Sequence, residues 1–256
     1  MELTFRKYQG TGNDFIMVDN RNNVFPTQQG LVSLLCDRKF GIGADGLILI
    51  EDHQELDYLM VYYNSDGSQS LCGNGSRCGY AFARELEMVG THATFETTDG
   101  VHHIKKENGL IHFQLHDLDE AISSIAEDLY IDTGSPHYIR WVEDVESVDL
   151  VSVGREIRNS SRFSGQNGTN VNFAQLLSNG VKMRTYERGV EDETLSCGTG
   201  ATAVALTASM KGRTSPVKLE TKGGNLEVYF EQSNGTFKNI WLAGPAEKVF
   251  EGTVSI

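Results

Sequence analysis

Two short segments of this chain place a cysteine directly before a glycine-rich turn and a helical pattern. Residues 72–75 read CGNG and residues 197–200 read CGTG. At a helix start several backbone N–H groups lack an intrahelical partner, so they favour a thiolate over a thiol and can also hold an anion. Glycine leaves these N–H groups open to a ligand carboxylate. Each segment taken alone could therefore be a nucleophile, an anion-binding turn or an ordinary helix start.

The surroundings of the two cysteines repeat in the same order along the chain. The matching pairs are residues 12–15 (GNDF) with 169–173 (TNVNF), 63–64 (YN) with 186–187 (YE), and 96–100 (ETTDG) with 220–224 (ETKGG). The first of these pairs is the loosest. Several echoes in one order at a near-constant offset indicate a duplication, so we interpret the chain as two homologous domains with one Cys-Gly-x-Gly segment each.

Two thiols in homologous positions suit the inversion of a stereocentre. If the two domains face each other, the thiolate of Cys72 or Cys197 can remove the Cα proton of a small ligand, and the opposing thiol can deliver a proton to the other face. The helix starts then stabilise the negative charge that grows on the substrate carboxylate. This chemistry requires neither a metal ion nor a pyridoxal group, so the pattern predicts an enzyme without a cofactor.

Two other classes of function remain open from the motifs alone. A non-catalytic module could capture an anion or amino acid at the two helix starts, but it would not need a thiol at both. A redox protein could cycle Cys72 and Cys197 through a disulfide, although the CxxC spacing typical of such proteins is missing. The other cysteines, Cys36 and Cys78, fall within helical patterns and are expected in the core.

Alternation of apolar and polar residues predicts a strand-rich chain with few helices. Strands are expected at residues 3–8, 15–18, 58–63, 101–105 and 110–115, and helices at 30–40, 76–89, 148–157 and 201–210. The last helix is apolar almost all round, which predicts a central position in its domain. Because alternation lapses over residues 116–121, we expect domains at 1–117 and 118–247, with a final strand at 248–256 that returns to the first.

Composition limits the partners and the location of this 256-residue chain. Acidic residues outnumber basic ones by 35 to 22, which argues against a nucleic-acid backbone or an anionic membrane surface as partner. The first ten residues alternate like a strand and lack an apolar signal core, so a cytoplasmic, reducing location with free thiols is expected. The cysteine and histidine spacings do not match a zinc site, and no metal is expected.

Segments spread over nearly the whole chain resemble the diaminopimelate epimerase family, in the family's order. They are residues 10–15 (GTGNDF), 64–68 (NSDGS), 72–78 (CGNGSRC), 134–137 (GSPH), 168–173 (GTNVNF), 187–189 (ERG), 197–201 (CGTGA) and 244–246 (GPA). The doubled Cys-Gly-x-Gly pattern is the most specific of these. The resemblance implies an α+β fold of two pseudo-symmetric domains, each a mostly antiparallel sheet or barrel wrapped around a central helix, with the active site in the cleft between them.

The resemblance also implies a function and a set of site residues. Members of the family epimerise LL-diaminopimelate to meso-diaminopimelate without a cofactor, in lysine and peptidoglycan precursor biosynthesis, and a homodimer is implied. Cys72 and Cys197 match the two bases, with His137 and Glu187 as catalytic support. The positions that match substrate-binding residues are Asn13, Asn64, Gly73, Asn74, Asn170, Glu187, Arg188, Gly198 and Thr199.

Two positions depart from the family's pattern and bear on the substrate. Ser135 stands where the family commonly has Asn, and Gly46 stands where some members carry a polar side chain. The main alternative is a racemase or epimerase of proline, hydroxyproline or histidine that uses the same two thiols. Arg188, together with Asn64 and Asn170, favours a substrate with a second carboxylate, because a guanidinium binds a carboxylate through two parallel hydrogen bonds.

Overall fold

The computed structural model describes residues 1–26, 30–119 and 122–256, which divide into two compact units. Unit 1 comprises Met1–Phe113 and Gly244–Ile256, and unit 2 comprises Gln114–Ala243. The sequence placed the corresponding boundaries after residues 117 and 247. Of the segment expected to contain the first boundary, residues 120–121 lie outside the described residues. Among the described residues, no helix is both long enough and apolar enough to cross a membrane.

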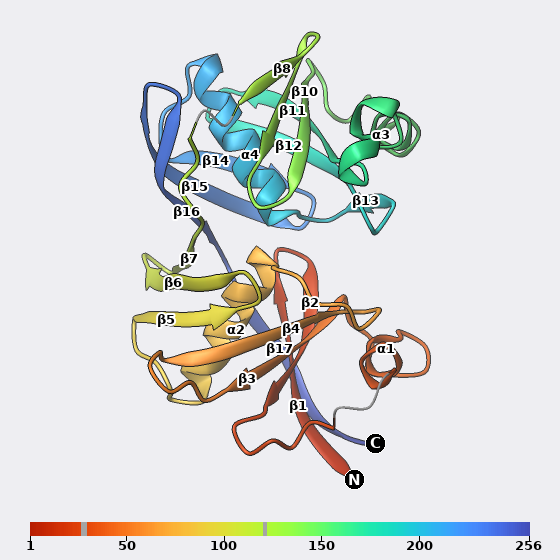
Figure 1. Cartoon of the computed structure of the whole chain (residues 1–256), viewed down its shortest axis with the longest axis vertical. Helices are drawn as coiled ribbons and strands as arrows, with labels where there is room; N and C mark the ends of the chain where they lie inside the picture. The colour runs from red at the N-terminus through yellow and green to blue at the C-terminus, as the bar shows by residue number, and fades with distance from the viewer. Residues whose placement is uncertain (27–29, 120–121) are drawn as a thin grey trace. The chain divides into compact units, whose positions relative to one another are not determined.

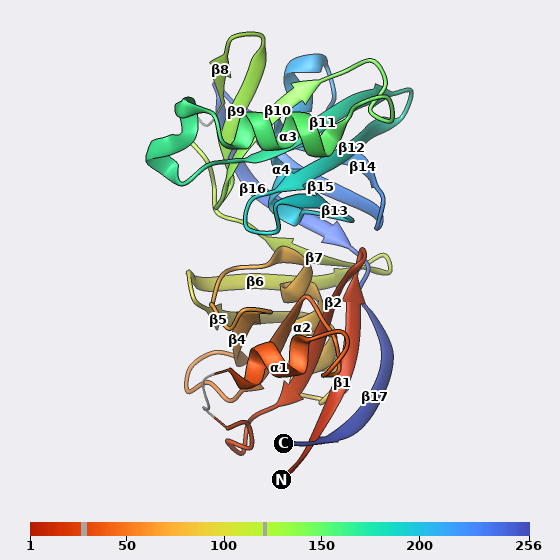
Figure 2. The ribbon, with the colours of Figure 1, turned by 90° about the vertical axis from the view of Figure 1, so that its right-hand side faces the viewer.

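In unit 1, strands surround helix α2 (Figure 1). Its elements are β1 (Glu2–Gly10), β2 (Asn13–Asp19), α1 (Leu31–Cys36), β3 (Gly46–Glu51), β4 (Tyr58–Asn64), α2 (Gly73–Glu85), β5 (His92–Thr97), β6 (Gly100–Glu107), β7 (Leu110–Gln114) and β17 (Glu247–Ser255). Strands β2–β3 and β4–β5 pair parallel, and the β1–β2, β3–β4, β5–β6 and β6–β7 pairs are antiparallel. Strand β17 runs antiparallel beside β1, so both chain ends lie in unit 1 (Figure 2).

Unit 2 repeats this plan around helix α4. Its elements are β8 (Ser123–Ile125), β9 (Asp128–Asp132), β10 (Pro136–Trp141), α3 (Leu150–Arg158), β11 (Asn170–Leu177), β12 (Gly180–Glu187), β13 (Asp192–Thr194), α4 (Gly198–Ala208), β14 (Val217–Thr221), β15 (Gly224–Ser233) and β16 (Thr236–Gly244), with 3-10 turns at Ser161–Gln166 and Ser209–Lys211. Pairs β10–β11 and β12–β14 are parallel, like β2–β3 and β4–β5. Every residue of α4 from Gly200 to Ala208 is buried, which confirms its predicted central position.

The strand registers align the two units residue by residue. Tyr63 pairs with Leu47 in β4–β3, and Tyr186 pairs with Val171 in β12–β11. Counting along β3 and β11 from these pairs matches Ile48 with Asn172 and Gly46 with Asn170. Across the neighbouring parallel strand, Gly46 pairs with Phe15 and Asn170 pairs with His137. Phe15 and His137 therefore also correspond.

This alignment corrects one expectation from the sequence. The loose echo between residues 12–15 and 169–173 is wrong, because the first segment leads into β2 and the second leads into β11. The counterpart of β2 is β10, which the sequence analysis had not paired with it. Short motifs of Gly, Asn and Phe recur at strand starts, so their similarity does not by itself identify equivalent strands.

The four helices lie where they were expected, but local contacts set their ends. Helix α1 ends at Cys36, since Asp37 Oδ1 accepts hydrogen bonds from the backbone N–H groups of Lys39 and Phe40 and turns the chain. Helices α2 and α4 begin earlier than residues 76 and 201, because the cysteines are extended N-cap residues and the following glycines are already helical. The backbone at Cys72 has φ −133° and that at Cys197 has φ −122°.

Candidate active site

The structure distributes the residues predicted for the active site over the two units. Unit 1 carries Asn13, Asn64, Cys72, Gly73 and Asn74, and unit 2 carries His137, Asn170, Glu187, Arg188, Cys197, Gly198 and Thr199. All four cysteines are free thiols. Cys36 and Cys78 are buried, which confirms the core position predicted for them. Burial raises the pKa of Cys36 to about 12 and that of Cys78 further, so both stay protonated.

Cys72 caps helix α2 with its own side chain. Its Sγ accepts a hydrogen bond from the Gly75 backbone N–H at 3.3 Å, and its carbonyl oxygen accepts one from Ser76 Oγ at 3.0 Å. A side chain at position 75 would start 3.3 Å from Ile48 Cδ1, so the glycine lets the helix start approach β3. The sulfur therefore lies at the positive end of the helix dipole with a backbone donor directed at it.

Asn74 and Asn13 form a directed chain of amide hydrogen bonds in unit 1. Arg77 Nη2 donates to Asn74 Oδ1 at 2.8 Å, and Asn74 Nδ2 donates to Asn13 Oδ1 at 2.5 Å. Asn13 Nδ2 then donates to Asp45 Oδ2 at 2.9 Å. Because a guanidinium can only donate and a carboxylate can only accept, both amides are held in one orientation.

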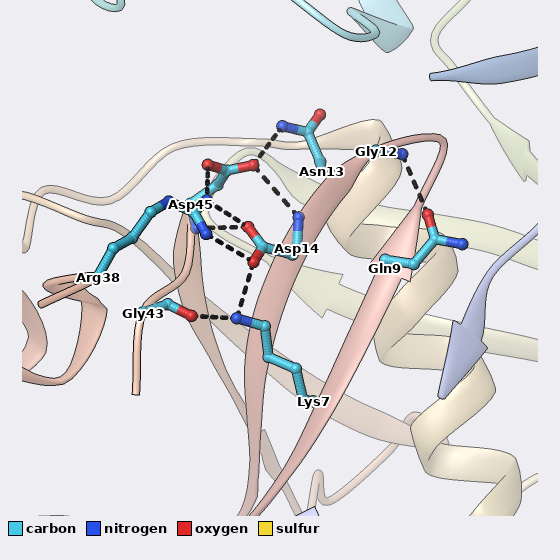
Figure 3. A network of polar contacts seen from close by, with 8 residues as sticks. All are labelled: Lys7, Gln9, Gly12, Asn13, Asp14, Arg38, Gly43 and Asp45. Carbon is cyan, nitrogen blue, oxygen red and sulfur yellow. Dashed lines mark hydrogen bonds and ion pairs between the residues drawn. The ribbon is translucent and has the colours of Figure 1, made fainter. Parts of the chain in front are cut away.

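Figure 3 shows the ion-pair cluster that holds Asp45. Arg38 donates to Asp45 Oδ1 at 2.8 Å and to both carboxylate oxygens of Asp14 at 3.0 and 2.7 Å. Lys7 is buried, lies 2.8 Å from Asp14 Oδ2 and donates to the Gly43 carbonyl oxygen. Burial alone would raise the pKa of Asp14, but the hydrogen bonds from Arg38 and Lys7 outweigh it and lower the pKa to about 2. The cluster therefore keeps the carboxylate of Asp14 charged beside Asn13.

Asn64 and Gly46 lie opposite each other in the β3–β4 ladder of unit 1. Asn64 donates to Ser68 Oγ at 3.0 Å and accepts from Ser70 Oγ at 3.2 Å, so its amide holds the loop that leads to the first cysteine. A Cβ at Gly46 would lie 2.5 Å from Tyr62 Cε2. The tyrosine ring thus fills the space that a polar side chain would need, which explains this departure from the family's pattern.

Asn170 connects Ser135 and Arg188 in unit 2. Its Nδ2 donates to Ser135 Oγ at 2.8 Å and to the Pro136 carbonyl oxygen at 3.0 Å, and its Oδ1 accepts from the Arg188 backbone N–H at 2.9 Å. Ser135, the other residue that departs from the family's pattern, therefore contacts Asn170 directly through its hydroxyl. The guanidinium of half-buried Arg188 donates to the Gly168 carbonyl oxygen at 3.4 Å.

Cys197 is the N-cap of helix α4 and belongs to a chain of polar side chains. Its Sγ lies 3.6 Å from Thr199 Oγ1, which lies 2.9 Å from His137 Nε2. His137 Nδ1 lies 3.1 Å from Asn172 Nδ2. The imidazole is wholly buried, and burial together with the charge of Arg188 lowers the pKa of His137 to about 3. The ring is therefore neutral at neutral pH.

Glu187 ends strand β12, and its Oε2 accepts a hydrogen bond from Thr194 Oγ1 at 2.8 Å. Sequence reasoning had not assigned a role to Arg77, Asp45 or Asn172, which the structure places in the two polar chains. Arg77 lies in the motif of residues 72–78, Asn172 lies in that of residues 168–173, and Asp45 directly precedes Gly46. These positions were the available signal. Their roles depend on which side chain they contact, and the motif does not show this.

The family model of diaminopimelate epimerase matches residues 5–117 and 129–249, which is one match for each unit. The chain belongs to the diaminopimelate epimerase family. It is 50% identical over 254 residues to a diaminopimelate epimerase of Flavobacterium psychrophilum, with 97% of this chain and 98% of the relative covered. A diaminopimelate epimerase of Aquifex aeolicus is 41% identical over 278 residues, with 99% and 98% covered.

The fold of the family extends to more distant proteins. A phenazine biosynthesis protein of the PhzF family from Bacillus anthracis superposes with a TM-score of 0.77 over the whole of both chains, at 17% sequence identity. A likeness at this identity concerns the fold alone. The family match and this superposition confirm the α+β fold of two repeats, each with strands around a central helix, that was expected from the sequence.

Proposed function

We propose that this chain epimerises LL-diaminopimelate to meso-diaminopimelate, with Cys72 and Cys197 as the two bases and with no cofactor. One observation carries the proposal: both repeats place a thiol at the N-cap of the central helix. Membership of the diaminopimelate epimerase family supports the choice of reaction and substrate. An anion-binding module would not require a thiol at both positions.

In the proposed reaction the two thiols, one from each unit, act on one substrate, so the predicted site residues of each unit form a half-site. One thiolate takes the Cα proton and becomes a thiol, while the electron pair of the broken C–H bond spreads into the α-carboxylate. The opposing thiol then donates its proton to the other face of Cα and becomes a thiolate. Backbone N–H groups at Gly73, Asn74, Gly198 and Thr199 bind the α-carboxylate, where the negative charge grows.

The distal end of the substrate is assigned to the remaining polar residues. Asn13, Asn64 and Asn170 lie at strand ends of the two half-sites, and Arg188 offers a guanidinium for the second carboxylate. A substrate such as proline has no such group. A homodimer, a cytoplasmic location and a role in lysine and peptidoglycan precursor biosynthesis complete the proposal. The homodimer and the biosynthetic role are supported by the family resemblance alone.

The test is the incorporation of solvent deuterium at Cα of LL- and meso-diaminopimelate, compared with proline, hydroxyproline and histidine. We expect exchange with diaminopimelate, and we expect Cys72→Ala and Cys197→Ala each to lower the rate of epimerisation at least about a hundredfold, the loss typical of a missing general acid or base. Cys36→Ala, which changes a buried thiol in unit 1, is the matched control and should stay active. Faster exchange of another amino acid would reassign the substrate, and an active Cys72→Ala or Cys197→Ala protein would contradict the two-base mechanism.

A further inference from the structure

The polar chain that reaches Cys197 has one direction, which the first of its side chains determines. Asn172 Oδ1 accepts a hydrogen bond from Thr185 Oγ1 at 2.9 Å, and Asn172 Nδ2 donates to the Tyr138 carbonyl oxygen at 3.1 Å. A carbonyl oxygen can only accept, so the amide group of Asn172 must face it with its N–H₂. The same N–H₂ group faces His137 Nδ1, which therefore accepts.

This orientation fixes the tautomer of the neutral imidazole. With Nδ1 as acceptor, the single ring proton of His137 is on Nε2, and Nε2–H donates to Thr199 Oγ1 at 2.9 Å. The hydroxyl oxygen of Thr199 thus uses one lone pair as acceptor, and its own proton can turn to Cys197 Sγ at 3.6 Å. The backbone of Thr199 is held in place, because its carbonyl oxygen accepts from Thr133 Oγ1 at 2.9 Å.

We propose that the hydroxyl of Thr199 is a positioning residue for Cys197: it relays the hydrogen bond of His137, held as the Nε2–H tautomer by Asn172, to the catalytic sulfur. The inference rests on the proposed function, since it gives a purpose to a group beside one of the two bases. When Cys197 is a thiolate, Thr199 O–H donates to it. When Cys197 is a thiol, S–H can donate to the second lone pair of the same oxygen, so the relay serves both protonation states.

The charged groups that line the same hollow as Cys197 are paired with each other. Arg184, Glu193 and Lys222 line the same hollow as Cys197, and Glu193 forms ion pairs with Arg184 at 2.7 Å and with Lys222 at 2.8 Å. Glu187 accepts from Thr194. A substitution confined to the hydroxyl of residue 199 leaves all of these groups, His137 and Arg188 in place. Any change in the titration of the sulfur can then be assigned to the relay.

The unit 1 half-site shows that the relay is not a requirement of the fold. The positions of His137 and Asn172 are occupied by Phe15 and Ile48 in unit 1, and Asn74 stands in place of Thr199. Asn74 directs its amide to Asn13 and Arg77. A buried imidazole and amide in unit 2 therefore replace an apolar pair, which calls for a reason other than packing.

The experiment compares Thr199→Val with Thr199→Ser in a full chain that also carries Cys72→Ser. Valine keeps the shape and the backbone N–H of residue 199 but lacks the hydroxyl, whereas serine keeps the hydroxyl. The ultraviolet absorbance of the thiolate is followed as a function of pH. Among the thiols, only Cys197 contributes to it below about pH 9, because burial raises the pKa of Cys36 to about 12 and that of Cys78 further. We expect valine to raise the pKa of Cys197 by about one unit and serine to leave it unchanged.

Thr199→Ala, which cannot crowd the turn, must give the same shift as valine. In the chain with both catalytic cysteines, one limb of the pH profile of kcat/KM should move by the same amount in the valine protein. Equal thiol titrations in the threonine, serine, valine and alanine proteins would overturn the relay. Since the thiol titration uses no substrate, it tests the relay even if the deuterium exchange of the wild-type chain contradicts the proposed reaction.

Discussion

The two half-sites have the same backbone arrangement around the cysteine, but their chains of hydrogen-bonded side chains end at different groups. In unit 1 the hydrogen bonds run from Arg77 through Asn74 to Asn13 and end on Asp45. In unit 2 they run from an amide through an imidazole and a hydroxyl to the sulfur of Cys197. The repeat therefore supplies a common place for a thiol, while the side chains around it specialise. Changes in the unit 1 chain should alter substrate binding, and changes in the unit 2 chain should alter protonation.

Arg77 is the least expected member of the unit 1 chain. Its side chain is wholly buried, and its described hydrogen bonds end on neutral oxygens of Gly73, Thr11, Asn74 and Pro245. Burial lowers the pKa of Arg77 to about 10, which still leaves it charged at neutral pH. Burial of a charge without a carboxylate partner is costly. We therefore expect Arg77 to orient the residues of the site and not to stabilise the fold.

The largest effect is expected from Arg77→Met. Loss of the guanidinium frees Asn74 to rotate and removes the charge on one side of the amide chain, so kcat/KM should fall about a hundredfold, or about 2.7 kcal/mol. Steady-state kinetics with diaminopimelate measure this. Arg84→Met, on the same helix and with its side chain over Tyr80, is the control and should stay within about threefold of wild type. Equal activity of the two variants would remove Arg77 from the site.

The sequence predicted the thiols and several residues near them but not how their side chains are connected, for a physical reason. The motif around Cys72 and Cys197 is local, because a cap, its glycines and the following helix are consecutive in the chain, and it was readable without a structure. The relay joins residues 137, 172 and 199, which only strand register brings together. The misplaced echo of residues 169–173 has the same origin, since strand order is a non-local property.

His137 makes the stability of unit 2 sensitive to mildly acidic pH, whereas the corresponding residue of unit 1, Phe15, does not titrate. Above about pH 6.5 the imidazole is neutral in both folded and unfolded chains, and its contribution to stability is complete. As pH falls below this value, the unfolded chain binds a proton that the folded chain, with the pKa of His137 near 3, does not bind. The free energy of unfolding then falls by about 1.4 kcal/mol per pH unit until the folded-state pKa is reached.

We therefore expect wild type to lose about 2 kcal/mol more stability than His137→Gln between about pH 6.5 and pH 5. Urea unfolding at several pH values measures the difference. Asp14 does not affect the comparison between about pH 6.5 and pH 5. Its pKa is lowered to about 2, so its contribution to the free energy of unfolding is lost only at more acidic pH. His92→Gln, at an exposed position of β5, should behave like wild type. Parallel pH curves for wild type and His137→Gln would mean that the imidazole is not held neutral.

The smallest effect is expected at Asp45, where the unit 1 chain ends. Asp45→Asn keeps the shape but puts an N–H₂ group where Asn13 needs an acceptor, so the amide of Asn13 loses its fixed orientation. We expect kcat/KM to fall about tenfold, or about 1.4 kcal/mol, mainly through KM, with an unchanged pH profile. The control is Arg21→Gln: its ion pair with Asp19 lies outside the chain that joins Asn74, Asn13 and Asp45, so the activity should persist. Two results would contradict the division of binding and protonation between the hydrogen-bond chains of unit 1 and unit 2. One is a shifted pH profile in Asp45→Asn, and the other is an effect on KM in Thr199→Val as large as its effect on the pH profile.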